Sequence, residues 1–375
     1  MRSWQPDDEG TLLLVSALSG SPVASDAWAA WSAVHTISGL NLGALRLLPL
    51  VDHNLQRNGQ TEGIGVAAGT VLVDMWCETQ LLFHEAAVLL GTLEDAGIET
   101  IVLKGAALAI LDYPDPLLRP MTDVDVLVRA RDATRAIDVL RDAGWSSNGS
   151  SVDGLMRFQH AVPFSNGQGG SVDLHWRVLW QRRDSAAGDE AFWDRSIPAT
   201  FNDVETRALA AEDRLLHVCV HGLAWSPMLP IRWVADAAMI IRRQGPNLDW
   251  ERLLEHARSR RLALPLFDAL GYLRTAFALP VPDRVIEALR DAPARRSTRL
   301  AHRIRTGREG TYLSHLHGWW IGSTSDRSAP AHRRLADFIS YYAATRGLRH
   351  GWQAPFRIAR TVTRVITRLV RPPSA

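Results

Sequence analysis

Lysine is almost absent from this chain of 375 residues. Lysine and arginine together number 42, yet Lys104 is the only lysine and every other one of these basic side chains is arginine. Either side chain serves on a solvated surface, so a lysine kept alone favours a position that needs a compact point charge, such as a contact with phosphate. The alternative is the chance survival of one exposed lysine.

Cysteines and long apolar runs are also scarce. Cys77 and Cys219 provide neither a disulfide framework nor the spacing of a zinc site. No segment reaches the roughly 18 uninterrupted apolar residues of a membrane span, and the first ten residues contain no apolar stretch of a secretory signal. The sequence therefore predicts a cytoplasmic protein, and its 46% hydrophobic residues are enough for two or three domains.

Acidic residues are scarce at one end of the chain. The part from residue 295 onward carries a net charge of +13, and since the whole chain carries +2, the first 294 residues carry −11. A helix predicted for residues 356–370 has arginines at helical spacing, with apolar residues mostly opposite. We expect this basic helix to dock on the acidic part of its own chain. The alternatives are an anionic membrane surface, an acidic partner or nucleic acid.

Apolar periodicity divides the chain into four parts. Helical spacing over 27–57 and 70–97 predicts an N-terminal helical region, residues 1–97. Strands expected at 99–104, 123–128, about 156–164 and 171–178, with a helix at 131–143, define a core at 98–207. A helical domain follows at 208–322, then a linker at 323–330 and basic helices to 375. The predicted fold is α/β (α+β), with a small mixed sheet that has helices on one face.

The later helices are expected at 211–223, 229–243, 249–259, 262–278, 282–291, 295–318, 331–346 and 355–370. Pro265 is expected to break or kink the fourth of them, since proline removes a backbone donor and clashes with the preceding turn.

The strongest chemical signal is the pair Asp123 and Asp125. Side chains alternate along a strand, so these two carboxylates point from one face while Val124 and Val126 point into a core. Carboxylates held this close repel each other unless a cation lies between them, and oxygen ligands suit Mg²⁺ or Mn²⁺ rather than zinc. A solvated strand end is the alternative, although aspartate is disfavoured in an apolar strand.

A third acid lies in the strand expected at 171–178. Asp173 and His175 share one face of the segment 171–176, while Val172 and Leu174 share the other. Three acids from two strands are what a two-metal phosphoryl or nucleotidyl transfer site requires. Asp173 can instead pair with Arg177. His175 can act as a base, orient the acceptor, or donate a hydrogen bond to a site carboxylate.

The segment around Lys104 has the character of an anion site. Gly105 lies where an apolar strand turns into an alanine-rich helix, so backbone N–H groups face outward there. The spacing of a P-loop is absent. Arg119 adds a second positive charge near the acids, unless it forms an ion pair with Asp112 or Asp115.

These motifs carry a resemblance to a known family. Lys104–Gly105, the segment from Tyr113 to Val128 and the segment 172–176 resemble the uncharacterised bacterial nucleotidyltransferases of the DNA polymerase β superfamily, and the likeness extends over roughly residues 75 to 290. It implies that Asp123, Asp125 and Asp173 are catalytic and hold Mg²⁺ or Mn²⁺. It also implies that Lys104 and Gly105 bind the triphosphate of an NTP. From their place near the acids, we add Arg119 and His175 to the candidate residues of this binding site.

The predicted activity is transfer of a nucleoside monophosphate from an NTP to a protein, peptide or small-molecule acceptor, which the sequence does not identify. One alternative is a regulatory nucleotide-binding module of the same fold. Another is an adaptor that reaches a membrane surface or anionic partner through the basic helix. Nucleic acid is not an expected partner. His217 and His221, one helical turn apart, lack a third ligand and the zinc-protease glutamate, so we interpret them as a buried polar pair.

Overall fold

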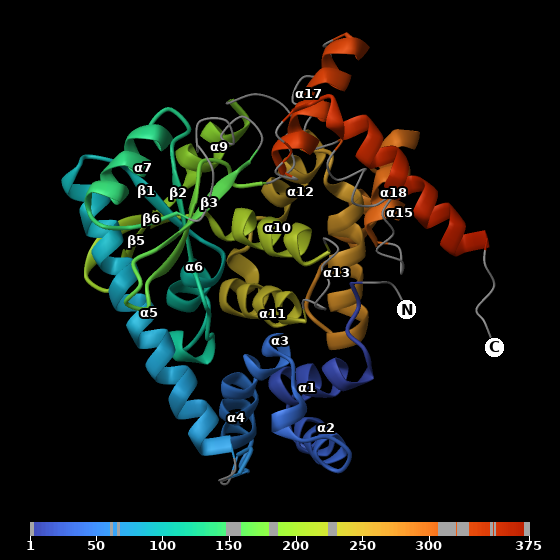
Figure 1. The fold of residues 1–375 in the computed structure, drawn as a ribbon. Coiled ribbons are helices and arrows are strands. Elements are labelled where there is room, and N and C mark those ends of the chain that lie inside the picture. Colours follow the sequence, from blue (N-terminus) through green and yellow to red (C-terminus); the bar gives the residue numbers. More distant parts are fainter. Residues whose placement is uncertain are drawn as a thin grey trace.

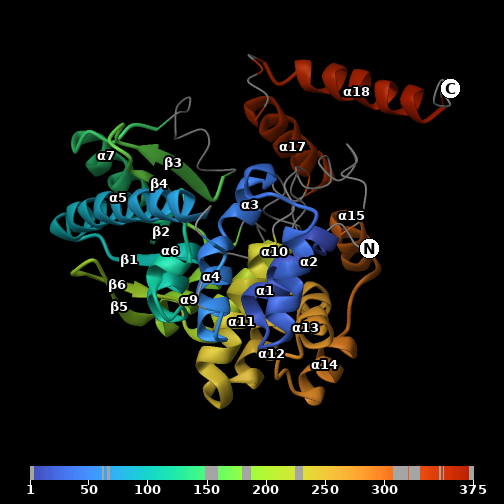
Figure 2. The same ribbon diagram turned by 90° about the horizontal axis from the view of Figure 1, so that it is seen from below.

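The computed structural model describes residues 4–60, 63–65, 68–147, 159–179, 187–223, 231–306, 320, 330–345, 348 and 350–370. Figure 1 shows three groups of elements: N-terminal helices, a sheet with its own helices, and a larger set of later helices. Seen from below in Figure 2, the N-terminal helices lie against the later ones.

The chain begins with helices that share a core. The side chain of Asp7 caps the first of them, because its carboxylate accepts a hydrogen bond of 2.8 Å from the amide of Gly10. This first helix packs on the second and on the fourth. The elements of this part are α1 (Asp8–Leu18), α2 (Val23–Ser32), η1 (Ile37–Gly39), α3 (Leu42–Leu45) and α4 (Leu48–Arg57). The long helix α5 (Gly69–Asp95) follows and packs mainly on the sheet.

Six strands form one mixed sheet in the order β3-β4-β2-β1-β6-β5. The central strand β2 pairs antiparallel with β1 and parallel with β4. The strands are β1 (Thr100–Leu103), β2 (Val124–Val128), β3 (Ala161–Ser165), β4 (Ser171–His175), β5 (Ile197–Phe201) and β6 (Val204–Ala208). The connecting elements are α6 (Lys104–Leu111), η3 (Pro116–Leu118), α7 (Ala133–Asp142) and α9 (Ala187–Arg195).

The two faces of the sheet bury different partners. Val124 and Val126 of β2 belong to an apolar cluster that includes Leu89 of α5 and Leu140 of α7. Leu127, which points the other way, belongs to a second cluster built largely from the N-terminal and later helices. Helices therefore cover both faces, whereas the sequence predicted helices on one. Since side chains alternate along a strand, Asp125 must face the second cluster.

The later helices pack closely on one another and on the N-terminus. A Cβ on Gly222 would clash with the ring of Trp233, so the glycine lets two successive helices approach. Trp4 contacts Trp233 and Tyr272, with ring centroids 5.9 and 5.5 Å apart. The elements are α10 (Ala211–Gly222), α11 (Arg232–Gln244), η4 (Gly245–Asn247), α12 (Trp250–Ser259), α13 (Ala263–Phe277), α14 (Asp283–Arg290), α15 (Arg296–Thr306), α17 (Ala331–Thr345) and α18 (Gln353–Val370).

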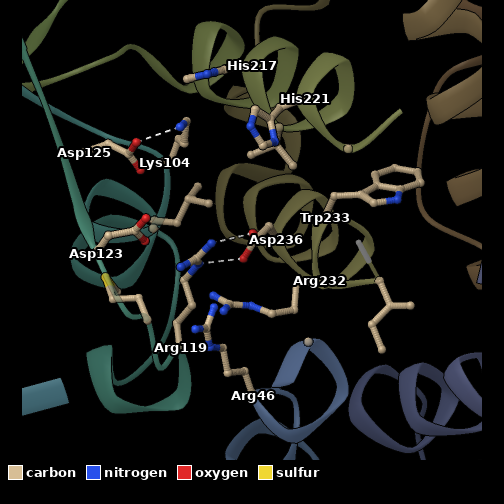
Figure 3. Close-up of a pocket in the computed structure, with 17 residues that line it drawn as sticks. Arg46, Lys104, Arg119, Asp123, Asp125, His217, His221, Arg232, Trp233 and Asp236 are labelled. Atoms are coloured by element: carbon tan, nitrogen blue, oxygen red, sulfur yellow. Dashed lines mark hydrogen bonds and ion pairs between the residues drawn. The ribbon is translucent and has the colours of Figure 1, made fainter. Parts of the chain in front are cut away.

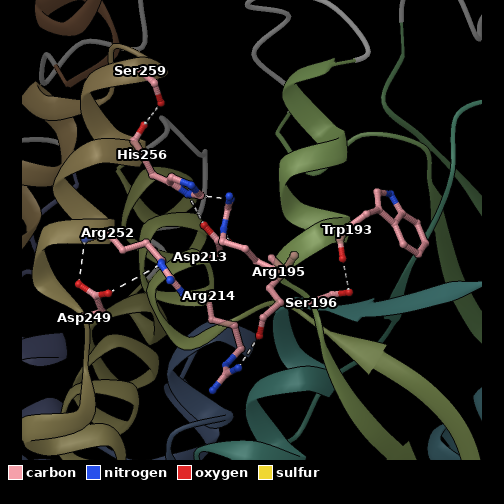
Figure 4. A network of polar contacts seen from close by, with 10 residues as sticks. Trp193, Arg195, Ser196, Asp213, Arg214, Asp249, Arg252, His256 and Ser259 are labelled. Carbon is pink, nitrogen blue, oxygen red and sulfur yellow. Dashed lines mark hydrogen bonds and ion pairs between the residues drawn. The ribbon is translucent and has the colours of Figure 1, made fainter.

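A buried polar network joins the sheet helices to the later ones (Figure 4). The Asp213 carboxylate on α10 is fully buried, lies 2.5 Å from Nδ1 of His256, and accepts a hydrogen bond of 3.3 Å from Nε of Arg195 at the end of α9. A buried carboxylate is stable when paired in this way. The network therefore fixes α10, which borders the site described below, against α9 and α12.

The last helix lies at the edge of the molecule. In Figures 1 and 2, α18 runs away from the sheet, and its main helix contact among the described elements is with α17. Trp352 and Phe356 near its start are 66% and 71% exposed. Within the described ranges, no helix has both the length and the apolar character needed to cross a membrane.

The predicted mixed α/β fold is confirmed, with further differences in detail besides the helices on both faces of the sheet. The first helix, α1, and the hairpin of β5 and β6 were not predicted. Pro265 lies in the first turn of α13 and does not break the helix, because the first amides have no intrahelical acceptor to lose. The predicted linker lies, except for Pro330, outside the described residues, as does the part of the predicted helix at 307–318.

Candidate functional site

Asp125 and Asp173 lie side by side in the sheet. They are direct partners in the parallel pairing of β2 and β4, which places both carboxylates on the face of the sheet that the later helices cover. One ligand atom each from Asp125, Asp173 and His175 lies within 4.8 Å of the others. Nε2 of His175 lies 2.8 Å from Oδ1 of Asp125. Of the alternatives for His175, the structure shows the hydrogen bond to a carboxylate.

Lys104 lies at the junction of β1 and α6, where its side chain reaches Asp125. Its φ of 41° is in the left-handed region, which is rare for residues other than glycine. Nζ donates to Oδ1 of Asp125 at 2.6 Å, and about a quarter of the side chain is exposed. Lys104 is therefore part of the carboxylate group and not an isolated surface lysine.

The surroundings shift the pKa values of the three acids in different directions. Burial alone would raise the pKa of Asp125, but Lys104 and His175 together lower it well below the usual range. Asp123, at the start of β2, has a raised pKa because it is partly buried and lies near Asp125. The pKa of Asp173 is raised by burial and by both other acids. Within the described chain, Asp173 forms no ion pair with Arg177.

This donor set fits a divalent cation. Asp125, Asp173 and His175 provide two carboxylates and an imidazole on one side of the sheet. Burial first, and then repulsion between the acids, raises the pKa of Asp123 and of Asp173, and a cation would relieve the repulsion. Carboxylate oxygens are the preferred ligands of Mg²⁺ and Mn²⁺.

Arg119 is held in place by a buried ion pair. Its Nε and Nη2 each donate to a carboxylate oxygen of Asp236 on α11 at 2.8 Å, and the hydroxyl of Tyr113 donates to the same carboxylate at 2.8 Å. The partner is thus neither Asp112 nor Asp115. The remaining nitrogen, Nη1, packs against Gly105, where a Cβ would clash with it.

A cavity of about 370 Å³ opens beside these residues. Figure 3 shows acids on one side, α10 with His217 and His221 on another, and three arginines at the far end. The side chains that give it its chemical character are Arg46, Lys104, Arg119, Asp123, Asp125, His217, His221, Arg232 and Asp236. Asp173 and His175 are not among its lining residues and reach it through Asp125.

The two histidines of α10 lie at this cavity with ring centroids 6.2 Å apart. Only 4% of His217 is exposed, and its pKa is lowered well below the usual value by burial, then by the nearby Lys104 and His221. A neutral imidazole at this place neither repels Lys104 nor requires a counter-ion. No cluster of metal-ligating side chains in the described residues includes either histidine.

The structure brings together every site residue that the sequence singled out. Asp123, Asp125, Lys104, Gly105 and Arg119 line the cavity, and Asp173 and His175 adjoin Asp125. Sequence reasoning missed Arg46, Arg232 and Asp236. Asp236 lies within the span of roughly residues 75 to 290 over which the family resemblance extends, but nothing local marked its role.

The fold and the site together define an α/β protein with paired carboxylates beside a cavity that three arginines line. The model of a family described as uncharacterised nucleotidyltransferase matches residues 43–278, well over half of the chain. The protein belongs to this family. All the site residues named above lie within the match.

Two further comparisons are with curated proteins and with solved structures. No curated protein matches the chain. Among solved structures, the crystal structure of an antigenic nucleotidyltransferase-like protein from Paracoccidioides brasiliensis is 13% identical, with a TM-score of 0.38 over 59% of this chain and 97% of that chain.

Proposed function

We propose that the protein transfers a nucleoside monophosphate from an NTP to an acceptor hydroxyl on a protein, a peptide or a small molecule. Family membership supports the reaction class. The observation that carries the proposal is the in-register pair of Asp125 and Asp173 beside a cavity large enough for a small molecule. We also propose that the fold belongs to the DNA polymerase β superfamily.

In the proposed reaction the acceptor oxygen forms a bond to the α-phosphorus, the bond to the bridging oxygen breaks, and pyrophosphate leaves. The acceptor proton passes to solvent. We assign Asp123, Asp125 and Asp173 as the residues that hold Mg²⁺ or Mn²⁺, whose charge would neutralise the phosphate and favour the deprotonated acceptor.

The chain's own residues position these acids. His175 and Lys104 both contact Oδ1 of Asp125, which leaves Oδ2 available for another ligand. Lys104 is also close enough to Asp123 to lower the pKa of that acid, against the effects of burial and of Asp125. A lysine between two acids at a cavity wall can contact a phosphate oxygen. We therefore propose that Lys104, the backbone at Gly105 and Arg119 meet the triphosphate.

We also propose which parts of the chain form the core and which form the other walls of the cavity. Residues 98–207 form the nucleotidyltransferase core, and residues 1–97 and 208–322 supply the other walls of the cavity through Arg46, His217 and Arg232. Residues 323–375 contribute no lining residue among those described.

Asp125→Asn tests the proposal. The amide keeps the size of the side chain but lacks the charge that holds a cation, so transfer should fall by about 100-fold or more, equivalent to roughly 3 kcal/mol of barrier. The assay follows label from α-phosphate-labelled ATP, CTP, GTP and UTP into lysate components with Mg²⁺ present. Asp194→Asn, an exposed acid on α9, is the control.

Transfer by Asp125→Asn within tenfold of the unaltered protein, with an unchanged circular dichroism spectrum, would contradict the assignment. Nucleotide binding without transfer by the unaltered protein would instead support the regulatory module.

A further inference from the structure

Three guanidinium groups meet at one end of the cavity, and they come from three separate parts of the chain. Arg46 follows α3, Arg119 follows η3, and Arg232 begins α11. Figure 3 shows them together, beyond Asp123 as seen from Asp125. Such a meeting of like charges is unfavourable in the absence of counter-ions.

Only one of these three arginines is paired with an acid in the described part of the chain. Asp236 pairs with Arg119 through two hydrogen bonds. Neither Arg46 nor Arg232 has a hydrogen-bond or ion-pair partner anywhere in the described part of the chain. Three positive charges thus meet where, among the described residues, only Arg119 has an ion-pair partner, and Asp123 attracts Arg46 without contacting it.

Burial lowers the pKa of both unpaired arginines. The pKa of Arg232 is lowered to about 9, first by burial and next by Arg119. Burial also lowers the pKa of Arg46, against the attraction of Asp123. Partly buried charges without partners destabilise a fold, so these positions are explained if a mobile anion completes them.

The geometry around Arg232 adds a further anion-binding feature. Arg232 is the first residue of the 13-residue helix α11, and no side chain caps that helix. Ile231, Arg232 and Trp233 all line the cavity. The unpaired amides of a helix N-terminus attract anions, and guanidinium groups match the oxygens of phosphate.

We propose that Arg46, Arg119, Arg232 and the N-terminus of α11 form a binding site for the terminal phosphates of a nucleoside polyphosphate. This inference rests on the proposed function and extends it, because it places the phosphate chain along a line from Lys104 past Asp123 to the arginines. The site takes groups from the N-terminal helices, the core and the later helices. Triphosphate binding therefore links all three.

Inorganic triphosphate is the probe, since it binds without any transfer reaction. Calorimetry in the presence of Ca²⁺ measures triphosphate binding, and the melting temperature of each protein is recorded as well. The proteins compared are the unaltered full-length chain, Arg46→Ala, Arg232→Ala and Arg232→Met. Arg258→Ala on α12 is the control, because that side chain is exposed and lies outside the cavity. We expect each cavity variant to bind triphosphate at least tenfold more weakly than the unaltered protein, and the control to bind equally well.

Melting temperature separates loss of the site from loss of the fold. Removal of an unpaired, partly buried charge should leave the ligand-free protein as stable as before or more stable, and Arg232→Met also retains the apolar contacts of the stem. Triphosphate should raise the melting temperature of the unaltered protein more than that of any cavity variant. Equal binding by Arg232→Met and the unaltered protein, or no binding by either, overturns the inference.

The outcomes for binding and for transfer are distinguishable. If no NTP yields transfer but triphosphate binding depends on Arg46 and Arg232, the phosphate site stands and the proposed reaction is wrong. If transfer depends on Asp125 while the arginine variants bind triphosphate normally, the reaction stands and this site is wrong.

Discussion

At the residue scale, the ion pair of Lys104 and Asp125 is the central contact of the site. The scarcity of lysine and the Asp-x-Asp pattern pointed to Lys104 and Asp125, and these two side chains are in contact at 2.6 Å. Nothing in the sequence distinguished Arg46 and Arg232 from the many other arginines. Only the folded chain brings these two side chains to the cavity. The backbone at Lys104, with a φ of 41°, was equally hidden, since strain of this kind depends on the surrounding structure.

Gly105 is the residue whose substitution should report on the site most directly. A Cβ at this position would clash with Nη1 of Arg119, and the bidentate pair with Asp236 prevents the guanidinium from moving freely. Gly105→Ala should therefore destabilise the protein by about 1–3 kcal/mol, as overpacking does, and should weaken triphosphate binding. Denaturant unfolding and calorimetry measure the two effects.

Gly91→Ala is the matched control for this substitution. Gly91 lies within α5, and a Cβ there meets no other atom within 4 Å. Alanine should stabilise this helix by up to about 1 kcal/mol. Equal stability of Gly105→Ala and the unaltered protein would mean that Arg119 is not confined as described.

Strands and helices were predictable to different degrees. The predicted alternation of side-chain directions around Asp125 and Asp173 is confirmed, because polar and apolar residues alternate over 123–126 and 171–175. The hairpin of β5 and β6 was missed, although Asn202 and Asp203 between the strands offered a signal. Their φ values of 44° and 67° match the two-residue turns that favour asparagine and aspartate. The pairing of β2 with β4 could not be read locally, because it joins strands about 50 residues apart.

Helix α10 provides a pH prediction. His217 is buried beside Lys104, and burial, then Lys104, lower its pKa in the folded state. The unfolded chain takes up a proton near pH 6.5, where the folded chain does not, so stability is full above that pH and falls as pH decreases further. His217→Gln should make this decline shallower by up to about 1.4 kcal/mol per pH unit. Urea unfolding between about pH 7 and 5 measures it.

His84→Gln is the control, because His84 is exposed on α5 and its replacement should leave the slope unchanged. A decline in His217→Gln as steep as in the unaltered protein would show that His217 does not stay neutral in the fold.

At the scale of the whole molecule, the charge asymmetry of the chain can be compared with the position of its last helix, α18. The part from residue 295 onward carries +13 and the first 294 residues carry −11, which led us to expect that the basic helix docks on the acidic part. In the structure α18 contacts mainly α17, and Trp352 and Phe356 are largely exposed. Of the alternatives named for this helix, we propose the anionic membrane surface.

Deletion of residues 352–375 tests this role. Because the main helix contact of α18 among the described elements is with α17, the truncated protein should stay monodisperse, with a melting temperature within about 3 °C of the full chain, equivalent to roughly 1 kcal/mol. It should lose binding to phosphatidylserine-containing vesicles, to which each arginine near the surface contributes about 1 kcal/mol. Full-length protein should bind these vesicles more weakly as salt increases, and Arg360→Glu should weaken binding without a change in melting temperature. Vesicles of phosphatidylcholine alone provide the uncharged comparison. Aggregation and a clearly lower melting temperature after truncation would instead support internal docking of α18.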